Sequence, residues 1–191
     1  YTVATELEFW VKTPNEITEI EDLKTSQGLH EQYWNKIDGS VRTAIEECLI
    51  IMDKYELCPE MGHKEVGGVK PKISFIGKYN HIMEQVEIDW KYSNPLQAAD
   101  NLIFIKEIVR KTFLANGLET TFLAKPIENV AGSGMHVHLG MIANKVDGSK
   151  INLFNSIENN FLSIIGFGAV MGMLKNYEVM SPFISSTDDS L

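Results

Sequence analysis

The sequence predicts an α+β domain built around a largely antiparallel sheet. Short stretches of alternating polar and apolar residues, typical of strands with one buried face, recur along the chain. Longer segments carry apolar residues with the 3.6-residue period of a helix. Strands and long helices are interleaved without the regular spacing of βαβ units, which favours this class over a parallel α/β sheet.

Taken in order, a strand is predicted over residues 2–12, where apolar residues alternate with Glu6 and Glu8. Residues 13–37 are polar and irregular, and Asp38 then caps a predicted helix. The apolar residues of that helix follow its period: Val41, Ala44, Ile45, Cys48, Leu49 and Met52. Strand patterns return at residues 63–66, 72–76 and 85–92.

A second helix is predicted to begin at Asn94-Pro95, a cap followed by proline at the first helical position, and to end at Asn116-Gly117. Further strands are predicted over 120–124 and 135–142, followed by a helical region at about 155–175. Residues 161–174 form the most apolar run but are shorter than the ~20 residues that span a bilayer, so we expect a buried helix. Three glycines in it are expected to serve helix packing: Gly166, Gly168 and Gly172.

The composition describes a folded protein with an acidic surface. The 191 residues suffice for one domain with a sizeable core, and 44% are hydrophobic against 23% charged. Acidic residues exceed basic ones by 26 to 17, which argues against nucleic acid or a membrane as a partner, because both need clustered Lys and Arg. Cys48 and Cys58 form neither a disulfide framework nor a zinc motif, so a cytoplasmic location is expected.

Pairs of polar residues on strand faces are the first candidates for chemistry. Residues two apart in a strand point to the same face. Three such pairs are predicted: Glu6 with Glu8, His63 with Glu65, and Glu87 with Asp89. Like charges so close resist ionisation unless a cation lies between them. Taken alone, each pair is also explained as an exposed strand face.

The segment Gly132-Ser133-Gly134-Met135-His136-Val137-His138 is the sharpest feature. Its two histidines are predicted to share a strand face, and imidazole is a common ligand for Mn or Zn. The glycines let the backbone approach a bound group, and Lys125 lies nearby in sequence as a cation for phosphate. Carboxylates with one imidazole suit Mg²⁺ or Mn²⁺ bound to phosphates, and phosphoryl transfer needs little beyond metals and positioned positive charge.

The motifs also occur in a recognisable order. They are Glu-x-Glu-Phe at 6–9, His-x-Glu-Val-Gly at 63–67, Gln-x-Glu-Ile at 85–88, Ala-Ala-Asp-Asn at 98–101, Thr-Phe-x-x-Lys-Pro at 121–126 and Gly-Ser-Gly-Met-His-Val-His at 132–138. Over nearly its whole length the chain resembles the catalytic domain of glutamine synthetases. The resemblance implies a curved, largely antiparallel sheet with flanking helices, with residues 1–191 as a single partial catalytic domain.

The resemblance implies two or more Mg²⁺ or Mn²⁺ ions. Glu8, Glu65 and Glu87 would hold the ion on the glutamate and ammonium side. Glu6 and His136 would hold a second ion that bridges the ATP phosphates.

The remaining site residues are likewise implied by the resemblance. Three fall where the family contacts nucleotide: Glu60, Tyr92 and His138. Three fall where it holds the backbone of glutamate: Gly132, Ser133 and Gly134. The implied reaction is ATP-dependent ligation of the glutamate γ-carboxylate to ammonia through γ-glutamyl phosphate, in a homo-oligomeric ring.

Departures from the family pattern keep alternatives open. In the family the two glutamates that correspond to Glu65 and Glu87 lie only about eight residues apart. Here about sixteen residues from Gly68 to Met83 intervene, so a hairpin or loop is inserted, and Ala131 stands where the family often has Asn. A γ-glutamyl ligase for a polyamine or other amine therefore remains an alternative, as does a non-catalytic relative. We expect the family's N-terminal β-grasp domain to lie outside this chain and its acid, base and arginine residues to lie beyond Leu191. We therefore expect this chain alone to bind metal weakly without turnover.

Overall fold

The computed structural model describes six stretches of the chain: residues 1–14, 39–69, 81–127, 130–156, 161–185 and 187–190. The predicted cap at residue 38, the strand pattern at 72–76 and most of the irregular segment 13–37 lie outside them.

A five-stranded sheet forms the centre of the described structure, with β1 (Thr2–Pro14) as its longest strand. β1 pairs with β3 (His81–Trp90), and β3 pairs in turn with β2 (Pro59–Val69). β4 (Glu119–Thr121) pairs with the second half of β1, and β5 (Val137–Gly140) pairs with its first residues. Every pairing among the described strands is antiparallel, which confirms the predicted class.

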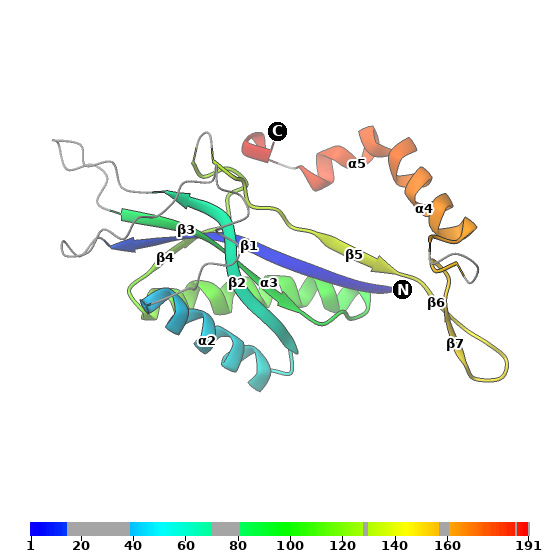
Figure 1. The fold of residues 1–191 in the computed structure, drawn as a ribbon, viewed down its shortest axis with the longest axis horizontal. Coiled ribbons are helices and arrows are strands. Elements are labelled where there is room, and N and C mark those ends of the chain that lie inside the picture. Colours follow the sequence, from blue (N-terminus) through cyan, green and yellow to red (C-terminus); the bar gives the residue numbers. More distant parts are fainter. Residues whose placement is uncertain (15–38, 70–80, 128–129, 157–160, 186, 191) are drawn as a thin grey trace.

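β2 is the irregular strand of the sheet. Its register against β3 shifts twice, between Pro59 and Met61 and again between Lys64 and Gly68. Extra residues in one strand bend it and increase its twist. Figure 1 shows β2 curving as it crosses the sheet, which agrees with the expected curvature.

Helices α2 (Gly39–Lys54) and α3 (Pro95–Ala115) cover one face of this sheet (Figure 1). α3 begins and ends as predicted, since the Asn94 side chain accepts a hydrogen bond from the backbone N–H of Gln97 and Gly117 follows with φ +75°. The odd-numbered apolar residues of β1 face the helices, and α2 contributes the periodic residues predicted for it. The main core residues are Leu7, Phe9, Val11, Val41, Ala44, Ile45, Cys48, Met52, Val86, Ile88, Ile105, Val109 and Phe113.

The predicted strand at 135–142 was wrong in its extent. β5 begins at Val137 and ends at Gly140, and a second strand, β6 (Ile142–Asn144), pairs with β7 (Lys150–Asn152) in a separate hairpin. Gly140, the last residue of β5, pairs with Thr2, the first residue of β1, so the pairing of these two strands ends there.

The apolar run is helical but is not a buried helix, so that prediction was wrong. α4 (Ile164–Lys175) starts later than expected, with Ser163 as its cap, and α5 (Tyr177–Ile184) and a short 3-10 turn (Asp188–Ser190) follow. Gly166 is the one buried residue of α4, because α4 and α5 lie apart from the sheet and from α2 and α3 (Figure 1).

The glycines of α4 do not all serve packing. A Cβ at Gly166 would lie 3.1 Å from both the Leu162 side chain and the Phe154 carbonyl oxygen, whereas at Gly168 and Gly172 it would meet no atom within 4 Å. Packing among the described residues therefore explains only the first of the three. Despite its apolar character, α4 has only 12 residues, and no described helix is both long and apolar enough to cross a membrane.

The two cysteines should differ sharply in reactivity. Cys48 is buried under the sheet, and burial raises the pKa of its thiol to about 12, whereas Cys58 is exposed. We expect a thiol-specific chromogenic reagent to modify Cys58 in the folded chain and Cys48 only after unfolding. Modification of both thiols by the reagent under native conditions would contradict the packing of α2 against the sheet.

Candidate functional site

Strand register brings acidic and imidazole side chains together on the sheet face opposite α2 and α3. Glu8 of β1 lies opposite Glu87 of β3, and Glu87 lies opposite His63 of β2. Glu6 lies opposite Asp89 in the next same-face position. The residue pairs predicted on three separate strands therefore form one continuous cluster.

Three groups of side chains in the cluster have the geometry to hold a metal ion. In each, one ligand atom per residue lies within 4.8 Å of the others. The groups are Glu8 with Glu65 and Glu87, Glu6 with Glu87 and His136, and His63 with Glu87 and Asp89. The structure thus brings together the two ligand sets expected from the resemblance, and it adds Glu87 to the second.

Several carboxylate oxygens in the cluster are buried without a hydrogen-bond partner among the described residues. They are Oε1 of Glu65, Oε1 of Glu87 and Oδ1 of Asp89. Burial of an unpaired anionic oxygen is unfavourable unless a cation or donor compensates it. An oxygen-rich set with one imidazole is the donor chemistry that Mg²⁺ and Mn²⁺ prefer, so the residues present fit such an ion.

The cluster resists ionisation as it stands. The pKa of Glu87 is raised to about 7, first by burial and then by the nearby Glu65 and Asp89 carboxylates, against the opposing hydrogen bond from His63. Burial also raises the pKa of Glu8, and the neighbouring Glu65 carboxylate adds to that effect. Both shifts come first from burial and then from like charge, and at Glu87 the hydrogen bond from His63 offsets them only in part.

His63 is the cationic neighbour of these carboxylates. Its Nε2 lies 3.5 Å from Asp89 and 3.1 Å from Glu87, and its Nδ1 lies 3.7 Å from Glu65. Hydrogen bonds to Asp89 and Glu87 raise the pKa of the imidazole to about 10. The sequence predicts that His63 and Glu65 share a face but assigns His63 and Asp89 no role in the site. The sequence signal for their place in the site is that each lies two residues from a predicted ligand, His63 from Glu65 and Asp89 from Glu87.

His136 and His138 both reach Glu6. The Nδ1 of His136 donates to one carboxylate oxygen at 2.7 Å, and the Nε2 of His138 donates to the other. The two imidazoles therefore face the same way, as their spacing predicted, although only His138 lies within β5. Burial acts to raise the pKa of Glu6, but these hydrogen bonds outweigh it and the pKa is lowered. The hydrogen bond to Glu6 raises the pKa of His136 in return.

The glycine-rich segment before His136 lies against the cluster. The Gly134 N–H donates to Oε2 of Glu8 at 2.8 Å, and the Ser133 N–H donates to the Ala124 carbonyl at 2.7 Å. A Cβ at Gly132 would lie 2.7 Å from that same carbonyl oxygen, so a larger residue there would displace the backbone. The Ser133 hydroxyl is buried without a hydrogen-bond partner among the described residues.

The three expected nucleotide-contacting residues lie toward one end of the sheet. Glu60 occupies the irregularity at the start of β2, Tyr92 follows β3, and His138 lies opposite Ala4 of β1. All three are exposed, so a ligand has access to them from solvent. Apart from the contact between His138 and Glu6, they do not belong to the metal-binding groups.

The expected insertion begins as an extension of the β2–β3 hairpin. Gly68 pairs with Glu84 and Val69 pairs with Met83, directly beyond the cluster. Residues 70–80 lie outside the described part of the chain.

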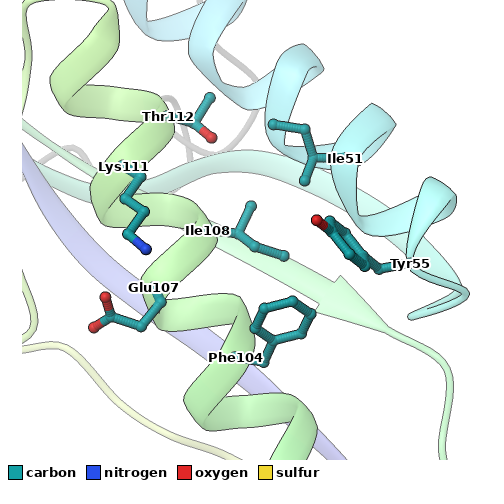
Figure 2. A pocket seen from close by; sticks show the side chains of 7 residues that line it. All are labelled: Ile51, Tyr55, Phe104, Glu107, Ile108, Lys111 and Thr112. Carbon is teal, nitrogen blue, oxygen red and sulfur yellow. The ribbon is translucent and has the colours of Figure 1, made fainter.

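A pocket of about 200 Å³ is separate from this cluster. It lies on the helical layer between α2 and α3 (Figure 2). Its lining residues are Ile51, Tyr55, Phe104, Glu107, Ile108, Lys111 and Thr112. Because these helices cover the opposite face of the sheet, the pocket is not part of the candidate site.

Comparison with known proteins decides the family. The family profile described as "Glutamine synthetase, catalytic domain" matches residues 1–191. The chain belongs to the glutamine synthetase family. The glutamine synthetase of Pyrococcus abyssi is 32% identical over 139 residues, which are 73% of this chain and 27% of that protein. That of Clostridium saccharobutylicum is 35% identical over 106 residues, which are 53% of this chain and 23% of that protein.

Solved structures of the family share the fold. The cryo-EM structure of Plasmodium falciparum glutamine synthetase superposes with a TM-score of 0.70 at 20% identity, covering 99% of this chain and 38% of that one. The structure described as "Apo GmaS without ligand" has the same TM-score at 22% identity, covering 99% and 40%. The chain thus spans about a quarter of the length of the curated glutamine synthetases it matches.

Proposed function

We propose that the acidic face holds divalent cations, Mg²⁺ or Mn²⁺. Glu8, Glu65 and Glu87 would hold one ion, and Glu6 with His136 would hold the second. The observation that carries this proposal is the set of buried, unpartnered carboxylate oxygens at the centre of the cluster. A bound cation would offset the burial and the like-charge repulsion that together raise the pKa of Glu87 and Glu8.

The protein that carries this chain would ligate glutamate to ammonia with ATP, through γ-glutamyl phosphate. Glu60, Tyr92 and His138 would contact the nucleotide from their exposed end of the sheet. The Gly132–Gly134 segment would hold the backbone of glutamate, where the unpartnered Ser133 hydroxyl is a further group for binding. The cations, when bound, supply charge neutralisation for the phosphates.

With these assignments, residues 1–191 would form one partial catalytic domain. The acid, base and arginine residues that such a reaction needs would come from other parts of the protein, which would act as a homo-oligomeric ring. The support for this is the share of the curated family members that the chain spans, about a quarter of their length.

Two features of the chain favour a second class of amine acceptor. The β2–β3 hairpin extends beyond Gly68 and Glu84, next to the carboxylate cluster, and Ala131 precedes the glycine segment. Both departures from the family pattern lie beside residues proposed above to hold a cation or glutamate. The alternative function is therefore a γ-glutamyl ligase for a polyamine or another amine.

ADP release tests both functions in the protein that carries this chain. With glutamate, ATP and Mg²⁺ or Mn²⁺, we expect ammonium to support turnover at least about tenfold faster than polyamines, a difference of about 1.4 kcal/mol in the barrier. Turnover with polyamines alone would replace ammonia by the second acceptor class. No turnover with any amine, while cation binding is intact, would overturn the ligase proposal and favour a non-catalytic relative.

A further inference from the structure

Gln85 is a fully buried polar residue at the junction of the site's parts. Its Nε2 donates to Oε2 of Glu8 at 2.8 Å and to the Gly132 carbonyl at 2.9 Å, and its Oε1 accepts from the Gly67 N–H at 3.1 Å. Both hydrogens of the amide are used, and its oxygen has a partner. In the sequence, Gln85 is notable only as part of the Gln-x-Glu-Ile motif.

These hydrogen bonds close a ring around the site. Gln85 contacts Glu8 and Gly132, and Glu8 accepts from the Gly134 N–H through the same Oε2 atom that Gln85 contacts. The third bond fixes Gln85 to β2 at Gly67, inside the irregular stretch between Lys64 and Gly68. Glu8, a proposed cation ligand, and the glycine segment are thus held together by the Gln85 side chain and by the direct hydrogen bond from the Gly134 N–H.

We propose that Gln85 is a positioning residue that holds the Gly132–Gly134 segment against Glu8. The proposal rests on the function above, in which that segment holds glutamate and Glu8 holds a cation. Gln85 would contact neither the cation nor the glutamate. It sets the distance between the two places where they would bind.

Only an amide fits these partners. An apolar side chain would leave the Gly67 N–H and the Gly132 carbonyl unpaired, at about 1–3 kcal/mol each. A carboxylate would place a second negative charge against Glu8, and in its protonated form it would offer one donor where two acceptors need one.

The first test measures backbone order in the chain itself by ¹⁵N relaxation. In Gln85→Met we expect the order parameters of Ser133 and Gly134 to fall from about 0.85 to below about 0.6, while Val109 in α3 stays near 0.85. Gln97→Met is the matched control, because Gln97 also donates a side-chain amide hydrogen bond, to Asn101 at 2.7 Å, but lies on α3, which covers the opposite face of the sheet. It should leave the segment unchanged.

A second variant keeps the test decisive if Gln85→Met does not fold. Gln85→Glu retains the shape and the acceptor for Gly67, and it should loosen the same segment because it loses at least one donor. Order parameters at Ser133 and Gly134 that equal the wild type in a folded Gln85 variant would overturn the positioning role. Equal loss of order at Val109 would also overturn it, by showing that Gln85 supports the whole sheet.

Kinetics in the protein that carries this chain then separate this role from the proposed function. We expect Gln85→Met to raise KM for glutamate about tenfold or more and KM for ATP by less than about twofold. A loosened segment with unchanged KM for glutamate would support the positioning role and overturn the assignment of glutamate to Gly132–Gly134. An equal rise in both KM values would overturn the inference that Gln85 acts through this segment.

Discussion

Replacement of Glu87 by glutamine is expected to lower the affinity of the chain for Mn²⁺ by at least about 100-fold, equivalent to about 2.7 kcal/mol. Glu87 belongs to all three groups of side chains that could hold a metal ion, so no group keeps its full ligand set in this variant. The amide has nearly the same shape as the carboxylate but lacks its charge. Titration calorimetry with Mn²⁺ measures the change directly.

The same variant should stabilise the metal-free chain, an effect of opposite sign. The pKa of Glu87 is raised to about 7 in the folded chain from its usual 4.5, so its contribution to stability is full below pH 4.5 and is lost as pH rises through about 7. Glutamine does not ionise, so the Glu87→Gln variant does not lose this stability as the pH rises. At about pH 8 in chelator we expect the melting temperature to rise by roughly 2–4 °C, the shift that about 1 kcal/mol produces in a chain of this size.

Glu46→Gln provides the control for both measurements. It makes the same change of charge on the exposed side of α2, where Glu46 pairs with Arg42. We expect its Mn²⁺ affinity to match the wild type and its melting temperature to change little, since exposed pairs contribute less than about 1 kcal/mol. Undiminished Mn²⁺ affinity in Glu87→Gln would exclude Glu87 as a ligand and with it the proposed arrangement of the site.

Phe9→Ala is expected to lower the free energy of unfolding by about 3–5 kcal/mol. Phe9 is fully buried under the sheet, with its ring centroid 5.3 Å from Phe113 in an edge-to-face arrangement and 5.6 Å from Phe122. The residue lies in β1 directly after Glu8, so its packing on α3 also holds the strand that carries the site. Urea unfolding followed by the fluorescence of the buried Trp10 and Trp90 measures the loss.

Phe183→Ala removes the same ring from an exposed position and is the matched control. Phe183 lies in α5 and is 84% exposed, so the free energy of unfolding should change by less than about 0.5 kcal/mol. A loss below about 1 kcal/mol for Phe9→Ala would contradict the described core. A large loss for Phe183→Ala would show that α5 packs against something in solution.

The sequence predicted the layers of the fold well, because alternation and helical period report which side of an element is buried. It placed Glu6 and Glu8 on the polar face of β1, and it located both ends of α3 from Asn94 and Gly117. The same logic failed for α4, because an apolar helix is predicted to be buried whether or not a partner is present. Among the described residues, no element covers it.

Motif order and residue periodicity, then, were enough to determine the family, the antiparallel class and most of the candidate ligands. Only the tertiary structure showed that Glu87 lies between Glu8 and His63 and that Gln85 joins the glycine segment to Glu8. It also showed that buried carboxylate oxygens have no hydrogen-bond partner in the described part of the chain. The physical reason is that periodicity specifies the face on which a side chain lies. Its neighbours across the sheet depend on register and bulges, which are set by contacts between residues far apart in the chain.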